Sequence, residues 1–209
     1  MTKATPVSSD VAFTPTVKTI QARKGSRNAY ARMEAGGGWK TTITPDLATF
    51  ISEQTSVFLG TANADGQPYI QHRGGPPGFL RVIDDKTIAF ADFRGNRQFI
   101  SQGNLAENDR AFLFLIDYAH RRRVKIWGTA RVAEDDPALL SSLMPSNYKA
   151  RGEQVILFRV NAWDSNCPQH IPQRFEAADV ARELDQRDQR IAQLEAEITR
   201  LKRQDAVTS

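Results

Sequence analysis

Three short polar clusters contain the residues of this chain whose types and spacing are suited to ligand binding. The first, residues 71–78 (QHRGGPPG), sits where a strand should continue, yet glycine and proline are poor strand formers. That composition indicates close approach of another group to the backbone. Its Gln, His and Arg side chains supply donors suited to a phosphate or to the carbonyl oxygens of a flavin. A bulged strand followed by a wide turn, with no ligand, explains the same residues equally well.

The second cluster, residues 92–98 (DFRGNRQ), is predicted at the end of a strand and the start of a short helix. The unpaired N–H groups of a first helical turn attract anions, and Arg94 or Arg97 would neutralise a phosphate. The alternative is that Asp92 or Asn96 caps the helix while the arginines stay in water. Taken alone, this cluster favours the capping interpretation.

The third cluster is residues 121–128 (RRRVKIWG), which form a predicted strand. Because side chains alternate along a strand, Arg121, Arg123, Lys125 and Trp127 are predicted to share one face. Such a face could stabilise the negative charge of a reduced flavin. It could also bind nucleic-acid phosphates, with Trp127 stacking on a base, or be a charged edge strand in solvent.

Strand patterns separated by turn residues surround these clusters. Six or seven mostly hairpin-linked strands with few helices predict a mainly β (α+β) fold, an antiparallel barrel that is closed or nearly closed. Thr44, Pro45 and Asp46 predict the start of a covering helix, and a short helix is expected over residues 137–144. The expected strands are residues 57–64, 68–73, 78–83, 87–93, 110–117, 122–134 and 153–163.

The two ends of the chain differ from this pattern. Residues 1 to about 15 are rich in Thr, Ser and Pro and predict a poorly ordered tail. Apolar spacing between Val17 and Met33 predicts one helix, ended by three glycines at 36–38.

Beyond Phe175, apolar residues recur at alternating steps of four and three, which is a heptad pattern. With Leu184, Ile191 and Ile198 at a positions, Leu194 and Leu201 fall at d, and this combination favours two parallel helices. Flanking charges at e and g are complementary for two pairs and repulsive for one. An amphipathic helix packed on its own barrel is the alternative.

The overall composition indicates one domain with an appended helix. The 209 residues carry a formal net charge of +4 on a mixed surface, which suits phosphate-bearing ligands as well as nucleic acid. Cys167 is the single cysteine, either a small buried residue or a reactive thiol, and with His170 it makes too small a set to predict a metal site. The sequence has no apparent signal or membrane span, so we expect a soluble, cytoplasmic protein.

The three clusters, in this order on successive hairpins, resemble the pyridoxamine 5′-phosphate oxidase-like family of FMN-binding split barrels. The likeness covers about residues 45–170 and is strongest in FLGTANADGQPYIQHRGGPPGFLRV, IAFADFRGNRQF and RRRVKIWGTARV. It implies a six- to seven-stranded split β-barrel that works as a homodimer with FMN between the subunits. Together with the patterns at the two ends, it divides the chain into a tail and helical segment (1–44), the FMN-binding barrel (45–175) and a coiled-coil-like helix (176–204). The implied flavin and phosphate contacts are Gln71, His72, Arg73, Gly74, Phe90, Ala91, Asn96, Arg97 and Arg123.

The resemblance also implies an activity, that of an FMN-dependent oxidoreductase. Hydride would pass between the flavin and a small-molecule substrate or a nicotinamide donor, NADH or NADPH. The chain departs from the biosynthetic oxidase at GGPPG and at Arg123, where that enzyme carries glutamine, so pyridoxamine phosphate is not implied as the substrate. No catalytic residue is assigned. The alternatives are a flavin carrier without turnover, a deazaflavin or haem protein, and a nucleic-acid-binding module.

Overall fold

A computed structural model describes residues 7–165 and 168–208, which form two compact units. The first unit comprises the chain up to Asp117 together with Arg122–Gln169, and it holds the β-sheet. The second comprises Tyr118–Arg121 and the chain from His170 onward.

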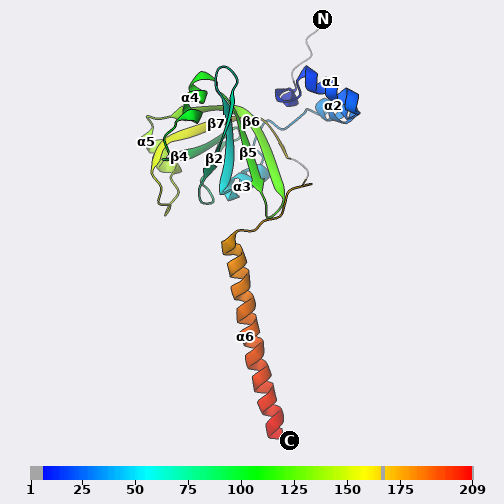
Figure 1. Ribbon diagram of the computed structural model, residues 1–209, viewed down its shortest axis with the longest axis vertical. Coiled ribbons are helices and arrows are strands. Elements are labelled where there is room, and N and C mark those ends of the chain that lie inside the picture. The colour runs from blue at the N-terminus through cyan, green and yellow to red at the C-terminus, as the bar shows by residue number, and fades with distance from the viewer. Residues whose placement is uncertain (1–6, 166–167, 209) are drawn as a thin grey trace. The chain divides into compact units, whose positions relative to one another are not determined.

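The first unit is built on one antiparallel sheet with the strand order β2-β1-β5-β6-β7-β4-β3. Figure 1 shows this sheet curled on itself. Within the described residues, edge strands β2 and β3 pair only with β1 and β4, so the barrel is not closed. The predicted antiparallel split barrel is thus confirmed, with seven strands. They are β1 (Ser56–Ala62), β2 (Pro68–Gly74), β3 (Arg81–Asp84), β4 (Thr87–Phe93), β5 (Arg110–Asp117), β6 (Arg122–Ala133) and β7 (Gly152–Ser165).

Alternation along the strands places the core on the inner face of the barrel. Leu59 of β1 pairs with Leu113 of β5, which pairs with Ile126 of β6, and all three are fully buried. Directly paired residues of antiparallel strands point to the same face, so this row continues the core across three strands. The residues between them in sequence point outward and are only half-buried.

Short helices flank the sheet. Thr44 caps α3 (Pro45–Glu53) by accepting a hydrogen bond from the Leu47 N–H at 3.4 Å, and Phe50 and Ile51 pack into the core. This confirms the predicted helix start. The helix expected over 137–144 is also present. The other helices are the 3₁₀ turn η1 (Ser8–Val11), α1 (Pro15–Lys24), α2 (Arg27–Ala35), α4 (Ile100–Glu107), α5 (Pro137–Leu143) and, in the second unit, α6 (Ala177–Thr208).

The N-terminal segment differs from its prediction in two ways. The expected single helix is two helices, because Gly25 adopts a left-handed conformation (φ 84°) and its N–H bonds to the carbonyls of Gln21 and Ala22, ending α1. The tail expected to be poorly ordered includes η1, whose Ser9 is fully buried. Residues 1–6 lie outside the described part of the chain.

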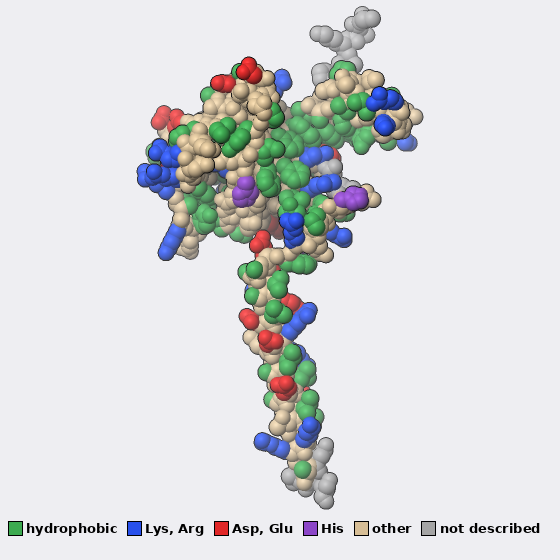
Figure 2. Space-filling model, in the orientation of Figure 1, with side chains coloured by type: hydrophobic (Ala, Val, Ile, Leu, Met, Phe, Trp, Pro, Cys, Tyr) green, Lys and Arg blue, Asp and Glu red, His purple; other side chains and the backbone are tan. Residues whose placement is uncertain are grey.

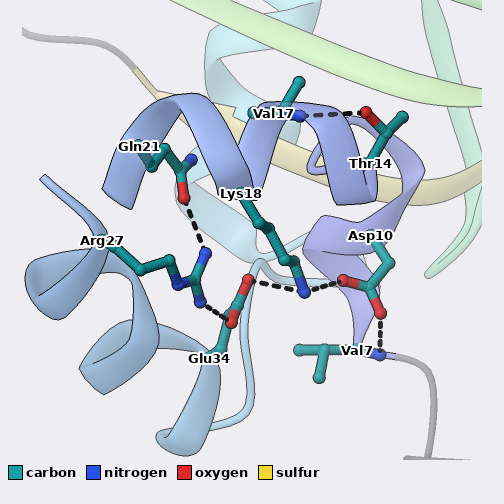
Figure 3. Close-up of polar contacts among 8 residues, drawn as sticks. All are labelled: Val7, Asp10, Thr14, Val17, Lys18, Gln21, Arg27 and Glu34. Atoms are coloured by element: carbon teal, nitrogen blue, oxygen red, sulfur yellow. Dashed lines mark hydrogen bonds and ion pairs between the residues drawn. The ribbon is translucent and has the colours of Figure 1, made fainter. Parts of the chain in front are cut away.

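Ion pairs hold these N-terminal elements together, as Figure 3 shows. Lys18 of α1 contacts Asp10 of η1 at 2.6 Å and Glu34 of α2 at 3.2 Å. Glu34 also pairs with Arg27, which donates a hydrogen bond to the Gln21 side chain at 2.6 Å. The hydrogen bond from Lys18 is the main reason that the pKa of Asp10 lies below its ordinary value. The three elements are therefore linked by a continuous charged network.

Aromatic stacking attaches this N-terminal segment to the barrel. Trp39 stacks on Trp127 of β6 with ring centres 4.6 Å apart and planes 14° apart, while Phe13 packs on Trp39 at 4.9 Å. Trp163 of β7 also binds this segment, since its backbone N–H donates to the Lys40 carbonyl at 2.9 Å and its indole N–H donates to the Thr42 carbonyl at 2.8 Å. The segment thus covers part of the outer face of β6.

Candidate phosphate-binding pocket

Strand β2 divides the first predicted cluster between the two faces of the sheet. Gln71 and Arg73 pair with the buried residues Leu59 and Val57, so their side chains lie on the inner face. His72 pairs with Phe58, points outward, and contacts the Ser56 hydroxyl at 2.6 Å. The structure therefore separates His72 from its two sequence neighbours.

A small polar cavity of about 40 Å³ brings four of the predicted site residues together. These are Gln71 and Arg73 from β2 and Asn96 and Arg97 from the loop after β4. That volume is large enough for a few water molecules or one phosphate-sized group. The remaining lining residues are Asp92, Phe93, Gly95, Gln98, Phe99, Ser101, Gln102, Glu153 and Gln154.

Arg73 forms a largely buried ion pair in this cavity. Its Nη1 lies 2.7 Å from Asp92 Oδ1, with side-chain exposures of 17% and 11%. Gln154 donates to the other Asp92 oxygen at 3.0 Å. Burial raises the pKa of Asp92 above its ordinary value, and the charge of Arg73 opposes that rise. Arg73 Nε is buried and makes no hydrogen bond with the described residues, so it is a donor in need of an acceptor.

The loop after β4 presents Arg97 at the mouth of the cavity. Arg97 and Phe99 adopt left-handed conformations, with φ of 59° and 55°, which cost non-glycine residues about 1–2 kcal/mol each. The Arg97 guanidinium lies over the Phe99 ring at 5.3 Å, and its Nε is 3.6 Å from Glu153 Oε1. That distance is too long for a hydrogen bond, so the donors of this exposed side chain can turn to an anion.

Helix α4 begins at the same cavity, through Ser101 and Gln102. Ser101 donates a hydrogen bond to Gln71 Oε1 at 3.0 Å, which fixes the Gln71 amide in place. The short helix expected to begin in the second cluster starts only at Ile100, so Asn96 does not cap it; Asn96 Oδ1 instead accepts from the Gln98 N–H in a local turn. Asp92 does not cap this helix either, since it lies inside β4.

A larger open cavity of about 730 Å³ adjoins the small one and shares Arg97, Phe99 and Glu153 with it. It continues along α4 and the start of β7, past Glu134 and Arg151. Its size lies in the range of small-molecule binding sites. The polar cavity therefore opens into space that can accommodate more than a phosphate.

The remaining candidates lie elsewhere. Phe90 and Ala91 of β4 are 1% and 3% exposed, so their side chains belong to the core. Gly74 lies on the His72 side of β2, where an added Cβ would come within 3.1 Å of the His72 ring. Gly78, later in the same cluster, lies against the end of α3, since its N–H donates to the Ser52 carbonyl at 2.7 Å.

Arg123 lies on the outer face of β6 with Lys125 and Trp127, as the alternation predicts. Arg121 does not belong to that face, because it lies in a turn with φ 52° before β6 begins. Trp39 stacks on Trp127, and Lys125 pairs with Asp164 at 3.1 Å. One face of Trp127 is thus already covered, which argues against its use as a stacking platform for a base.

Asp92, Gln154 and Glu153 are the pocket residues that the sequence did not reveal as a group. Gln154 and Glu153 lie about sixty residues beyond Asp92, and only the pairing of β4 with β7 brings them together. In the described residues no three His, Cys, Asp or Glu side chains gather as a metal site would require. Nor does any described helix have the length and apolar character needed to cross a membrane. Cys167 lies outside the described residues.

Comparisons with known proteins agree with the fold. The family model for pyridoxamine 5′-phosphate oxidase matches residues 43–167, which include all seven strands. No curated protein sequence matches the chain.

Solved structures that resemble the chain do so at low identity. HupZ of Group A Streptococcus is 15% identical, with a TM-score of 0.49 over 63% of this chain and 99% of that one. A putative pyridoxamine 5′-phosphate oxidase from Lactobacillus delbrueckii is 20% identical, with a TM-score of 0.45 over 60% and 95%. An FMN-binding protein from Syntrophomonas wolfei is 11% identical, with a TM-score of 0.44 over 70% and 97%. Since the family match spans more than half of its residues, the chain belongs to the pyridoxamine 5′-phosphate oxidase family.

Proposed function

We propose that the protein is an FMN-dependent oxidoreductase that binds the FMN phosphate in the small polar cavity between β2 and α4. The observation that carries this proposal is Arg73 Nε, a buried donor without a hydrogen-bond acceptor, in a cavity that also receives Arg97. A phosphate dianion would accept from both guanidinium groups and from the first turn of α4. Family membership supports the same ligand class.

The cavity can bind an anion only if its arginines contact the phosphate as well as the neighbouring carboxylates. Asp92 already compensates one cation, and Glu153 lies 3.6 Å from both Arg94 and Arg97. Because Glu153 can remain with Arg94, Arg97 is available to the phosphate. Arg73 can keep Nη1 on Asp92 while its Nε donates to the ligand. The pocket can therefore bind a phosphate while Asp92 and Glu153 each keep an arginine partner.

The small cavity can hold only part of the FMN molecule, and two candidate residues for the rest lie outside it. About 40 Å³ cannot enclose a whole FMN molecule, so the isoalloxazine ring must extend beyond this pocket. His72 and Arg123 lie on the outer face of the sheet and cannot point into the pocket of their own chain. In a homodimer with the flavin at the subunit interface, the outer face of the second subunit would bring these two residues to the ring.

The outer face is suited to such an interface. Phe58, Phe112 and Phe114 are half-buried there, and Ile70 is 69% exposed. Figure 2 shows hydrophobic side chains gathered on the barrel, with Lys and Arg side chains beside them. An apolar patch bordered by charge is typical of a surface that binds a partner.

The chain's own residues would bind and orient rather than react. FMN, when bound, supplies hydride transfer at its N5 atom with a small-molecule substrate or with NADH or NADPH. Arg73, Arg97 and the start of α4 would hold the phosphate, and Arg123 would place positive charge near the ring. Asp92 and Glu153 are both engaged by arginines, so neither is assigned as a general base.

FMN titration of an Arg97→Ala variant tests the site. Loss of a charge-assisted phosphate contact should weaken binding by about 1.5–3 kcal/mol, or roughly 10- to 150-fold in Kd. Arg94→Ala is the matched control, since Arg94 has the same 3.6 Å contact with Glu153 but does not line the cavity. Equal affinities for the two variants would remove Arg97 from the site.

The visible spectrum tests the activity. FMN should bind with a flavin spectrum that NADH or NADPH bleaches under anaerobic conditions. A bound flavin that no nicotinamide reduces would indicate a carrier without turnover. A haem or deazaflavin spectrum, or no bound chromophore, would contradict the proposal.

A further inference from the structure

Helix α6 carries an apolar stripe of exposed side chains along its length. The helix has 32 residues, a length of about 48 Å. Side chains spaced at alternating steps of four and three fall on one stripe. Isolated helices of ordinary composition are marginal in water without packing against a partner. The stripe consists of Val180, Leu184, Ile191, Leu194, Ile198 and Leu201, which are 41–53% exposed.

We propose that a second copy of the chain covers this stripe, in a parallel two-stranded coiled coil. Ile191 and Ile198 occupy a positions, and Leu194 and Leu201 occupy d positions. β-Branched residues at a with leucine at d favour parallel dimers over larger bundles. The proposal depends on α6 alone and does not require that the barrel bind flavin.

Charges beside the stripe support the same register. In a parallel dimer Arg190 at g faces Glu195 of the second copy at e, and Glu197 faces Lys202. Within one chain these charges have weaker partners. Arg190 bonds to the neutral Gln193, and the contact of Glu197 with Arg200 is 4.0 Å long. Pairing between copies therefore completes interactions that one helix leaves weak.

The charges also disfavour a register shifted by one heptad. A stagger of one heptad would place Arg190 opposite Lys202 and Glu183 opposite Glu195 along one side of the coil. Both pairs repel. The in-register dimer has two attractive pairs and one repulsive pair per side, whereas three of the four charged pairs repel in the shifted dimer, so the charges favour the alignment that the apolar stripe alone would leave open.

One layer of the dimer is polar. Arg187 falls at d, and its side chain pairs with Glu183 on the same helix at 3.4 Å. Glu183 would face Asp188 of the second copy across the interface, which is repulsive in isolation. The two Arg187 side chains lie between these four carboxylates, so positive charge at d compensates negative charge at e and g. This layer weakens the dimer and adds to its specificity.

Site-specific disulfide cross-linking of the full-length protein tests the parallel arrangement. Leu194→Cys and Leu201→Cys are made separately in a Cys167→Ser background, with Ala196→Cys on the opposite face as the control. Mild oxidation should give a cross-linked fraction roughly tenfold larger at each d position than at 196, because d side chains meet their counterparts across a parallel dimer whereas residue 196 lies at the outward-facing f position. An antiparallel pair could cross-link at no more than one of the two positions. A helix packed on its own barrel would cross-link at neither, and either result would overturn the proposal.

A gain of association provides a second test. Arg187→Leu should lower the concentration at which the α6 dimer forms by roughly tenfold, since it replaces a polar layer by an apolar one. Gln189→Leu adds the same side chain on the outer face and should leave that concentration unchanged. If the two variants behave alike, Arg187 does not lie at the interface. Flavin absorbance recorded on the same samples shows separately whether the FMN proposal holds.

Discussion

Replacing Arg73 by methionine should destabilise the barrel, and by more at neutral pH than in acid. Methionine keeps most of the apolar stem of Arg73 and removes its charge. In the wild type Arg73 Nη1 lies 2.7 Å from Asp92 Oδ1, and both side chains are largely buried. In the variant Asp92 keeps the hydrogen bond from Gln154 but loses its counter-charge.

The magnitude follows from burial. Removing one partner of a buried ion pair costs about 3–5 kcal/mol, because the remaining charge is uncompensated. Since a sixth of the Arg73 side chain is still exposed to water, we take the lower end, about 3 kcal/mol. For a domain of this size that corresponds to a fall in Tm of about 6–12 °C.

The pH dependence follows from Asp92. Its pKa in the folded protein is already raised by burial, and Arg73 is the main influence that lowers it. Without Arg73 the folded-state pKa rises further, so the folded protein binds this proton more tightly than the unfolded chain does. Stability from that proton is complete below the ordinary aspartate pKa and is lost as pH rises through the folded-state pKa. The variant should therefore recover part of its loss in acid.

Thermal unfolding of five proteins at about pH 8 and about pH 5 measures both effects. The proteins are the wild type, Arg73→Met, Asp92→Asn and the double variant, with Arg131→Met on exposed β6 surface as the matched control. The double variant should lose less than the sum of the single losses, because it leaves no unpaired charge. If Arg73→Met behaves like Arg131→Met, or if its loss of stability does not shrink in acid, the ion pair is not what stabilises this site.

Two other predictions concern packing. Trp39→Ala should lower stability by about 2 kcal/mol, since it removes a stacked half-buried indole, and limited proteolysis should show earlier cleavage before residue 39. An unchanged cleavage rate would mean that the stack does not hold the N-terminal segment. Gly128→Ala should cost roughly 3 kcal/mol or more, because its Cβ would clash with the backbone carbonyl oxygen of Arg159 in β7. Gly95→Ala, with nothing within 4 Å, is the control and should unfold at the wild-type temperature.

Local signals in the sequence predicted most elements of the barrel. Thr44 and Pro45 gave the start of α3, and the polar turns at 64–66 and 84–86 separated the expected strands. These features depend on a few adjacent residues, so they are visible without the tertiary structure. The start of α4 was misplaced because Asn96 satisfies a local turn four residues before the helix begins.

Contacts between distant segments were not predictable in the same way. Aspartate often caps helices, which suggested that role for Asp92. Only the register of β4 with β7 shows that Asp92 faces Gln154 in a buried pair. Trp127 has the appearance of an exposed stacking residue, and only the N-terminal segment shows that Trp39 covers it. Both errors arise because a local pattern gives the direction of a side chain but not what lies against it.

The cluster at Gln71, His72 and Arg73 shows how the period of a strand bears on function. Adjacent residues in sequence suggested one binding surface, yet period-two alternation sends His72 to the face opposite its neighbours. Inner-face donors can reach a phosphate in their own subunit, whereas an outer-face side chain can reach only a ligand bound by another molecule. If all three residues contact one flavin, that flavin must lie between subunits. Loss of FMN affinity in both Arg73→Met and His72→Ala would thus support a shared site, and loss in Arg73→Met alone would confine the flavin to one chain.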